Sequence, residues 1–283
     1  MNKTVLGVLF AVFGVGAIQA AEPDLSIEGV AGSLRFSKWQ DNRGGWSVAE
    51  YVGRNKSFYI YPWHVGATSN DVGWTFYTVP ERLSPGRRYI MLQRVDYSTV
   101  ANEEGKEEHT EQAFCEAVDL ESGCVTYSGS VQACDGEWVG EKWSTSWENV
   151  NFSTWGTPPG VLAAQVGGLK TPESRSMAVY DDLFMGVDSY MACYPLADSN
   201  VADYNNLAFY LAGGGWHVTA VQLYMKLLAF APERTPLKLN IADSLWALGK
   251  KGEALGYYQD YRQAMVREGK SARIPVRVNQ RLH

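Results

Sequence analysis

One set of side chains in the sequence could act as a catalytic triad, formed by His64, Ser69 and Asp71. In a serine hydrolase, a histidine takes the proton of the serine hydroxyl and an acidic residue orients the histidine ring. The chain has no Gly-x-Ser-x-Gly turn, which would present such a serine at the end of a strand. Serine and aspartate also occur near a histidine by chance. We therefore predict no catalytic residues, and we expect that the protein is not an enzyme.

Two other segments have compositions found in active sites. The carboxylate pair Asp181 and Asp182 lies at an expected turn between two helices, where acidic residues cap the start of the second helix. The triple glycine at 213–215 lacks the lysine and the preceding strand of a phosphate-binding loop. We interpret it as a turn between helices, and we expect no nucleotide cofactor.

Four cysteines could form disulfides or bind a metal: Cys115, Cys124, Cys134 and Cys193. No Cys-x-x-Cys pair occurs and the four histidines are scattered, so the spacing of a zinc site is absent. In an oxidising compartment, cysteines close in the sequence tend to pair. Cys115, Cys124 and Cys134 lie within twenty residues of each other. We expect one disulfide between two of these three, with the pairing open, and no metal or other cofactor.

The chain begins like a secretory signal peptide. Lys3 is followed by an apolar run of fourteen residues, 5–18, and then by small residues that suit cleavage after Ala20. A membrane-spanning helix needs about 20 apolar residues, so we expect no permanent membrane anchor. The sequence predicts a signal peptide at 1–20 and a protein that is periplasmic or secreted after cleavage.

Net charge and length limit the classes of protein to which the chain can belong. The chain of 283 residues has a formal net charge of −6, spread along its length. Nucleic-acid binding relies on a basic face, and the sequence contains none, so we expect no nucleic-acid partner. The length of the mature chain is sufficient for two ordinary domains, and the change in sequence pattern near residue 165 supports that division.

The first of these domains, 21–165, is rich in aromatic and β-branched residues interrupted by glycine, proline and asparagine, which is typical of short β-strands. The polar segment 102–112 is expected to form an exposed loop or a short helix. The expected strands are 57–61, 73–79, 88–97, 124–132 and 137–143.

Eight of the ten tryptophans precede residue 160, which leaves two interpretations of the aromatic content. Large aromatic side chains supply much of the core of a small β domain. Alternatively, exposed rings such as Trp138, Trp143 and Trp147 stack on sugars. The second interpretation makes the chain an envelope carbohydrate-binding or adhesin module.

Three segments of this β domain resemble the small β domains of the surface-adhesin protein E group: 88–97, 118–127 and 155–166. The family's cysteine before the basic strand is not reproduced here. The resemblance implies an envelope-exposed β module, and we carry over no site residue from it.

After Gly168 the pattern repeats with a period of 34 residues. Two conservative matches, Leu207 with Ile241 and Val221 with Leu255, support the same offset. The identical pairs at this offset are Asn206 and Asn240, Ala208 and Ala242, Leu211 and Leu245, Gly215 and Gly249, Ala220 and Ala254, and Tyr224 and Tyr258. A fixed period of this length indicates stacked helical units.

The period and the alternation of small and large residues resemble the tetratricopeptide repeat family over 166–267. The resemblance implies a helical domain at 166–283, made of a degenerate unit at 166–199, two full units at 200–233 and 234–267, and a C-terminal cap. In the degenerate unit only the second helix, about 182–196, is expected to be well formed. The repeated alanines are then the close contacts between helices, and the repeated glycines end the first helix of each pair.

The same resemblance implies a peptide-binding groove along the first helices, with Asn205, Phe209, Asp243 and Trp246 pointing inward. Phe209 and Trp246 could equally be packing residues between helices. Cys193 falls where the family prefers a small buried residue, so a free, buried thiol is expected there. The basic tail at 267–281 forms either an end cap or a surface for an acidic partner.

These observations predict an α+β protein, with an N-terminal, aromatic-rich, mostly antiparallel β domain followed by a C-terminal helical array. The leading functional hypothesis is an exported, non-enzymatic adaptor, assembly factor or inhibitor that binds a protein or peptide partner in the array. One alternative is the carbohydrate-binding or adhesin module described above. Another is an immunity protein that neutralises an exported toxin.

Overall fold

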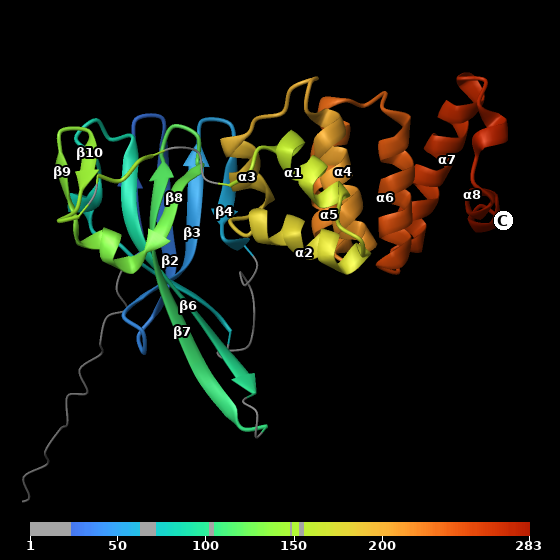
Figure 1. Cartoon of the computed structure of the whole chain (residues 1–283). Helices are drawn as coiled ribbons and strands as arrows, with labels where there is room; N and C mark the ends of the chain where they lie inside the picture. Colours follow the sequence, from blue (N-terminus) through green and yellow to red (C-terminus); the bar gives the residue numbers. More distant parts are fainter. Residues whose placement is uncertain (1–23, 63–71, 102–104, 148, 153–155) are drawn as a thin grey trace, which may run out of the picture.

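The computed structural model describes residues 24–62, 72–101, 105–147, 149–152 and 156–283. It has the expected α+β class, with an antiparallel sheet followed by a row of helices (Figure 1). The expected signal peptide at 1–20 and the triad candidates His64, Ser69 and Asp71 lie outside these residues. Within them, none of the helices has the length and apolar character needed to cross a membrane.

The larger sheet has eight strands, all paired antiparallel, in the order β1-β2-β3-β5-β6-β7-β8, with β4 paired to β3. Its strands are β1 (Leu25–Glu28), β2 (Gly32–Gln40), β3 (Gly45–Gly53), β4 (Ser57–Ile60), β5 (Gly73–Tyr77), β6 (Tyr89–Ala101), β7 (Glu107–Asp119) and β8 (Val125–Ser130). The amide of Val30, after β1, donates a hydrogen bond to the carbonyl of Arg87, just before β6 (2.9 Å). The sheet is therefore curled, because its first strand reaches the start of the fifth strand in the order.

The alternation of side chains along β6 assigns its two faces to two cores. Ile90 and Leu92 pack into the larger core, while Met91 between them packs into a smaller cluster with Trp143. That cluster lies under a second, two-stranded sheet made of β9 (Glu137–Val139) and β10 (Lys142–Ser144). We expected one strand at 137–143. The structure has a hairpin there instead, because Gly140 takes a positive φ of 62° that allows a tight turn.

The β6–β7 hairpin extends beyond the rest of the sheet (Figure 1). Pairing continues from Tyr89 opposite Asp119 as far as Ala101 opposite Glu107. The prediction of a loop or short helix at 102–112 is therefore wrong for 107–112, which belongs to β7. Polar side chains such as Ser98 and Thr110 stabilise this part through cross-strand hydrogen bonds (2.9 Å).

The helical part begins at Pro159, before the boundary that we expected at 166. Its first unit differs from the prediction of a poor first helix and a long second one. Thr171 forms a capping box with Ser174 at the start of α2, which is well formed, whereas α3 is short. Asp182 ends α2 instead of capping α3, and its carboxylate accepts a hydrogen bond from the amide of Thr157 (2.8 Å). The helices are α1 (Pro159–Gly167), α2 (Pro172–Asp182), α3 (Val187–Cys193), α4 (Val201–Gly213), α5 (His217–Phe230), α6 (Thr235–Ala247), α7 (Lys251–Arg267) and α8 (Val276–Arg281).

The two full units occur where the 34-residue period predicts them, since α4 and α6 begin at Val201 and Thr235. The four repeated alanines are fully buried between helices. Gly215 and Gly249 take positive φ angles of 90° and 76° after α4 and α6, as expected for residues that end a helix. The same hydrogen bond closes both helix ends. The amide of Trp216 donates to the carbonyl of Leu211, and the amide of Lys250 donates to the carbonyl of Leu245, each at 3.0 Å.

Helix α3 joins the sheet to the helical array. The amide of Tyr61, after β4, donates to the carbonyl of Met185 (3.1 Å), and the Ser189 hydroxyl donates to the carbonyl of Gly123 (2.9 Å). Side chains of the sheet and of all the longer helices belong to one continuous core. The helices then lie side by side from α3, next to the sheet, to α8 at the far end (Figure 1).

Two disulfides are present, and one corrects the sequence prediction. Cys115 is bonded to Cys134, which is one of the pairings left open within the β domain. Cys193 is bonded to Cys124, so it is not the free, buried thiol that we expected. The reason is that α3 packs against the sheet and places Cys193 beside Cys124. Two disulfides fit an exported protein outside the reducing cytoplasm.

Candidate functional site

The candidate site is an open hollow of about 200 Å³ on the helical array, formed by three helices. Helix α4 contributes residues near its C-terminal end, α5 contributes its first turns, and α6 contributes the middle of its length. The lining residues are Phe209, Ala212, Gly213, His217, Tyr224, Asn240, Asp243 and Ser244. Two of the four predicted groove residues, Phe209 and Asp243, are among them.

Phe209 is the exposed aromatic residue of this hollow. Its neighbours Leu207, Ala208 and Leu211 are fully buried, whereas Phe209 is 57% exposed. The helical period explains the difference, because residues 207, 208 and 211 share the face of α4 that packs on the array and residue 209 lies off that face. Among the aromatic rings of the described residues, the Phe209 ring contacts that of its neighbour Tyr210, in a T-shaped arrangement with centroids 6.2 Å apart.

Asn205 lies next to the hollow without lining it. Its side-chain oxygen accepts a hydrogen bond from the Nδ2 group of Asn240, 3.0 Å away. This bond links α4 to α6, so Asn205 fixes the spacing of two helices that form the walls. Its predicted role as an inward contact for a partner stays a prediction.

Asp243 is engaged by the C-terminal helix. Its carboxylate accepts hydrogen bonds from Arg277 (2.7 Å), Arg281 (2.7 Å) and the Tyr258 hydroxyl (2.7 Å). Burial alone would raise the pKa of Asp243, but the hydrogen bonds from Arg277 and Tyr258 and the two positive charges outweigh it and lower the pKa. Val278 of α8 is fully buried and anchors these arginines. For Arg277 and Arg281, this geometry supports the end-cap interpretation of the basic tail.

Trp246 does not line the hollow. It is partly buried against the core, its ring lies 6.2 Å from that of Tyr258, and the Arg281 guanidinium lies 4.9 Å from its centroid. Lys251 approaches the same ring at 5.3 Å. Trp246 therefore packs between α6, α7 and α8, which is the second of the two roles that the sequence left open.

Several lining residues were not identified from the sequence as site residues. The Nδ1 atom of His217 is buried and has no hydrogen-bond partner in the described chain, and burial lowers the pKa of this histidine. His217 follows the turn at Gly215 and is not one of the residues that match at the 34-residue offset. Asn240 and Tyr224 did appear as matched residues of the 34-residue repeat, but neither was assigned to the groove. Because this Nδ1 is buried, the imidazole contributes to the hollow as a lining side chain beside the exposed phenyl ring.

Two of the three tryptophans proposed for sugar stacking have other roles. Trp143 is 2% exposed and donates from Nε1 to the carbonyl of Ala133 (2.6 Å), so its assignment to an exposed surface is wrong. Trp138 is partly buried against Trp143, with ring centroids 5.2 Å apart, and donates to the carbonyl of Arg82 (3.0 Å). Trp147 is exposed. Two of the three rings are held by the small core of the β domain and are not free platforms.

No protein-family model matches this chain, and no curated protein matches it significantly. In the part of the chain that the structure describes, no three histidine, cysteine or acidic side chains are grouped as a metal ion would require. The arrangement of α4, α5 and α6 is therefore the basis for a functional assignment.

Proposed function

We propose that this protein is an exported, non-enzymatic binding protein that holds a protein or peptide partner in the hollow between α4, α5 and α6, as an adaptor, assembly factor or inhibitor. The observation that carries the proposal is Phe209, a large aromatic ring that is 57% exposed at an open hollow of about 200 Å³. Aromatic anchors near the centre of an interface supply much of its binding energy. Burying this ring against a partner removes apolar area from water.

The residues around Phe209 favour a peptide as the ligand, and not a small substrate. Ala212 and Gly213 leave room beside the ring, and His217 and Asn240 add polar atoms at its edge. An apolar side chain of the partner packs on Phe209, whose ring is exposed at this hollow. The likeness to tetratricopeptide repeats adds to this proposal, because that family binds peptides along the first helix of each pair.

The proposal includes export through the leader at 1–20, followed by cleavage near Ala20. The two disulfides support an oxidising compartment. N-terminal sequencing of protein recovered from its natural source is expected to start near Ala21. Recovery of protein that begins at Met1 and remains in the cytoplasmic fraction would contradict export.

The binding function is tested by site-specific photocrosslinking in the natural source. A photoreactive phenylalanine analogue replaces Phe209 in one variant and Phe230 in the control variant. Phe230 is also exposed (44%), but it lies at the end of α5 and does not line the hollow. We expect a discrete protein adduct from position 209 and none from position 230.

Once the crosslinked partner has been identified, its affinity for the mature protein and for a variant is measured. Replacing Phe209 by alanine is expected to weaken binding of the recovered partner by about 10- to 100-fold. Equal labelling at the two positions, or an unchanged affinity after Phe209→Ala, would show that the hollow is not the binding site.

A further inference from the structure

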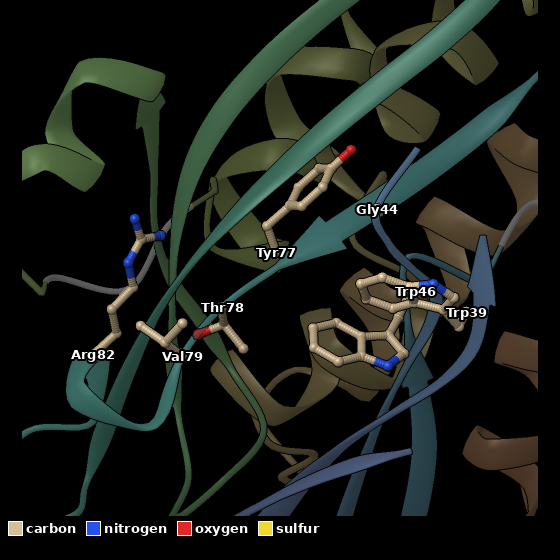
Figure 2. A pocket seen from close by; sticks show the side chains of 7 residues that line it. All are labelled: Trp39, Gly44, Trp46, Tyr77, Thr78, Val79 and Arg82. Atoms are coloured by element: carbon tan, nitrogen blue, oxygen red, sulfur yellow. The ribbon is translucent and has the colours of Figure 1, made fainter. Parts of the chain in front are cut away.

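A second hollow, of about 340 Å³, lies on the β domain, away from the helical array. Its volume is at the lower end of the range of about 300–1,000 Å³ that is usual for small-ligand sites. Figure 2 shows the two tryptophans toward one end and Arg82 toward the other, with Thr78 and Val79 between them. The lining residues are Trp39, Gly44, Trp46, Tyr77, Thr78, Val79 and Arg82.

At the aromatic end of the hollow, the Trp39 ring is supported by other aromatic side chains. Trp39 is partly exposed and lies edge-on to Trp46, with centroids 5.0 Å apart and an interplanar angle of 71°. Trp46 is only 8% exposed and packs in turn on Phe36, 5.5 Å away. Next to Trp46, Gly45 lets β3 approach β5 closely, since a Cβ there would meet Thr75 at 2.5 Å. Trp39 is thus held in place with part of its ring open to a ligand.

The other end carries a positive charge that no carboxylate of the described chain contacts. The Arg82 guanidinium makes no hydrogen bond or ion pair at contact distance with any residue that the structure describes. By contrast, Arg43, Arg88 and Arg94 each pair with a carboxylate at 2.7–3.1 Å. Arg82 is also partly buried, and burial lowers its pKa although the more distant Asp135 acts the other way. A partly desolvated guanidinium without a carboxylate is suited to an anionic group from a ligand.

Two hydroxyl groups of the lining residues can only accept hydrogen bonds from a ligand. The Tyr77 hydroxyl gives its hydrogen to the carbonyl of Arg43 (2.9 Å), so toward a ligand its oxygen can only accept. The Thr78 hydroxyl likewise gives its hydrogen to the carbonyl of Met91 (2.9 Å). A suitable ligand therefore has an apolar ring face, hydroxyl donors and an acidic group.

We propose that this hollow binds an acidic sugar chain, with the C–H face of one ring on Trp39 and a carboxylate of the chain on Arg82. A sugar acid combines the three required features, because it presents an apolar face, several hydroxyl donors and a negative charge. A simple aromatic acid has the ring and the charge but lacks the donors. A neutral sugar lacks the charge that Arg82 selects.

Isothermal titration with the full mature protein tests the assignment, with α-1,4-linked digalacturonate as the acidic probe. Maltose, which has the same linkage and no carboxylate, and benzoate, which has the carboxylate and no hydroxyls, serve as comparison probes. We expect digalacturonate to bind at least about tenfold more tightly than either of the others. Failure of digalacturonate to bind at millimolar concentration, or equal affinity for benzoate, would overturn the proposal.

Three variants assign the contacts. Arg82→Gln is expected to weaken digalacturonate binding by about 10- to 100-fold without changing maltose binding. Trp39→Leu is expected to weaken both sugars. The matched control is Arg54→Gln, because Arg54 is exposed at the β3–β4 turn and does not line the hollow. Circular dichroism of each variant verifies folding, and a loss in Arg54→Gln equal to that in Arg82→Gln would show that general charge, not this site, holds the probe.

Discussion

Cys193 of α3 is disulfide-bonded to Cys124, which directly precedes β8, and their Cα atoms are 4.8 Å apart. Beside this bond, the hydroxyl of Ser189 on α3 donates to the carbonyl of Gly123 (2.9 Å). The bond closes a loop of 69 residues and links the sheet covalently to the helical array. The two structural parts are therefore fastened at the same short helix that also packs against β4 and β8.

Removal of this bond is expected to destabilise the protein more than removal of the bond within the β domain. The double variant Cys124→Ala with Cys193→Ala should lower the free energy of unfolding by about 2–4 kcal/mol. The bond between Cys115 and Cys134 spans 19 residues, so loop entropy predicts a loss smaller by about 1 kcal/mol for its double alanine variant. Urea denaturation of both variants compares the losses. The reverse order would mean that packing, not loop closure, sets the difference.

Arg94 and Glu116 form a buried ion pair inside the curled sheet, with Nε and Oε1 3.0 Å apart. Both side chains are almost fully buried, and burial raises the pKa of Glu116 to about 7 against the opposing charge of Arg94. Arg94→Leu leaves this carboxyl without its cation, so we expect a loss of about 3–5 kcal/mol near pH 8. Denaturation at several pH values measures the loss.

The pH dependence of that variant has a definite sign. Without Arg94, the folded-state pKa of Glu116 rises further above its value of about 4.3 in an unfolded chain. A raised carboxyl pKa costs no stability below the unfolded value, and the cost grows as pH rises toward the folded value. Arg94→Leu should therefore be less destabilising at pH 5 than at pH 8. Adding Glu116→Leu to Arg94→Leu should recover much of the lost stability and remove this pH dependence. If the double variant were as unstable as Arg94→Leu, the unpaired carboxylate of Glu116 would not be the cause of the loss.

Ala242 tests the close approach of helices in the array. It is fully buried on α6, where the repeat places a small residue. Ala242→Leu should cost about 1–3 kcal/mol of unfolding free energy through overpacking. Ala247→Leu is the matched control, because Ala247 is exposed at the end of the same helix. Equal melting temperatures for the two variants would show that α6 has room at residue 242.

The repeat pattern predicted the backbone of the array because a period records constraints that recur. Gly215 and Gly249 illustrate this, since both must take positive φ to end a helix and both are glycine. The disulfide between Cys193 and Cys124 occurs once and is not part of any repeat. It depends on how one short helix packs on the sheet, a relationship between residues 69 positions apart that no local spacing reveals.

The site was predicted only in part for a similar reason. The repeat resemblance placed Phe209 in the groove but left packing between helices equally open, and it could not show that α8 returns to Asp243 through Arg277. Composition also could not separate a core tryptophan from an exposed one. Trp143 is buried because it packs with Ala133 and Cys134, which lie on the short 3-10 helix Val131–Asp135, and its Nε1 donates to the carbonyl of Ala133.

The last prediction separates the two aromatic residues that the sequence placed together in the groove. Phe209 is 57% exposed, so Phe209→Ala should change the free energy of unfolding by less than about 0.5 kcal/mol. Trp246 packs on Tyr258 and under Arg281, so Trp246→Ala should cost about 1–3 kcal/mol, below the usual loss for a fully buried tryptophan. Urea denaturation of the two variants measures both changes. If Phe209→Ala were the more destabilising, its ring would be a packing residue, and the hollow would lose the exposed anchor on which binding depends.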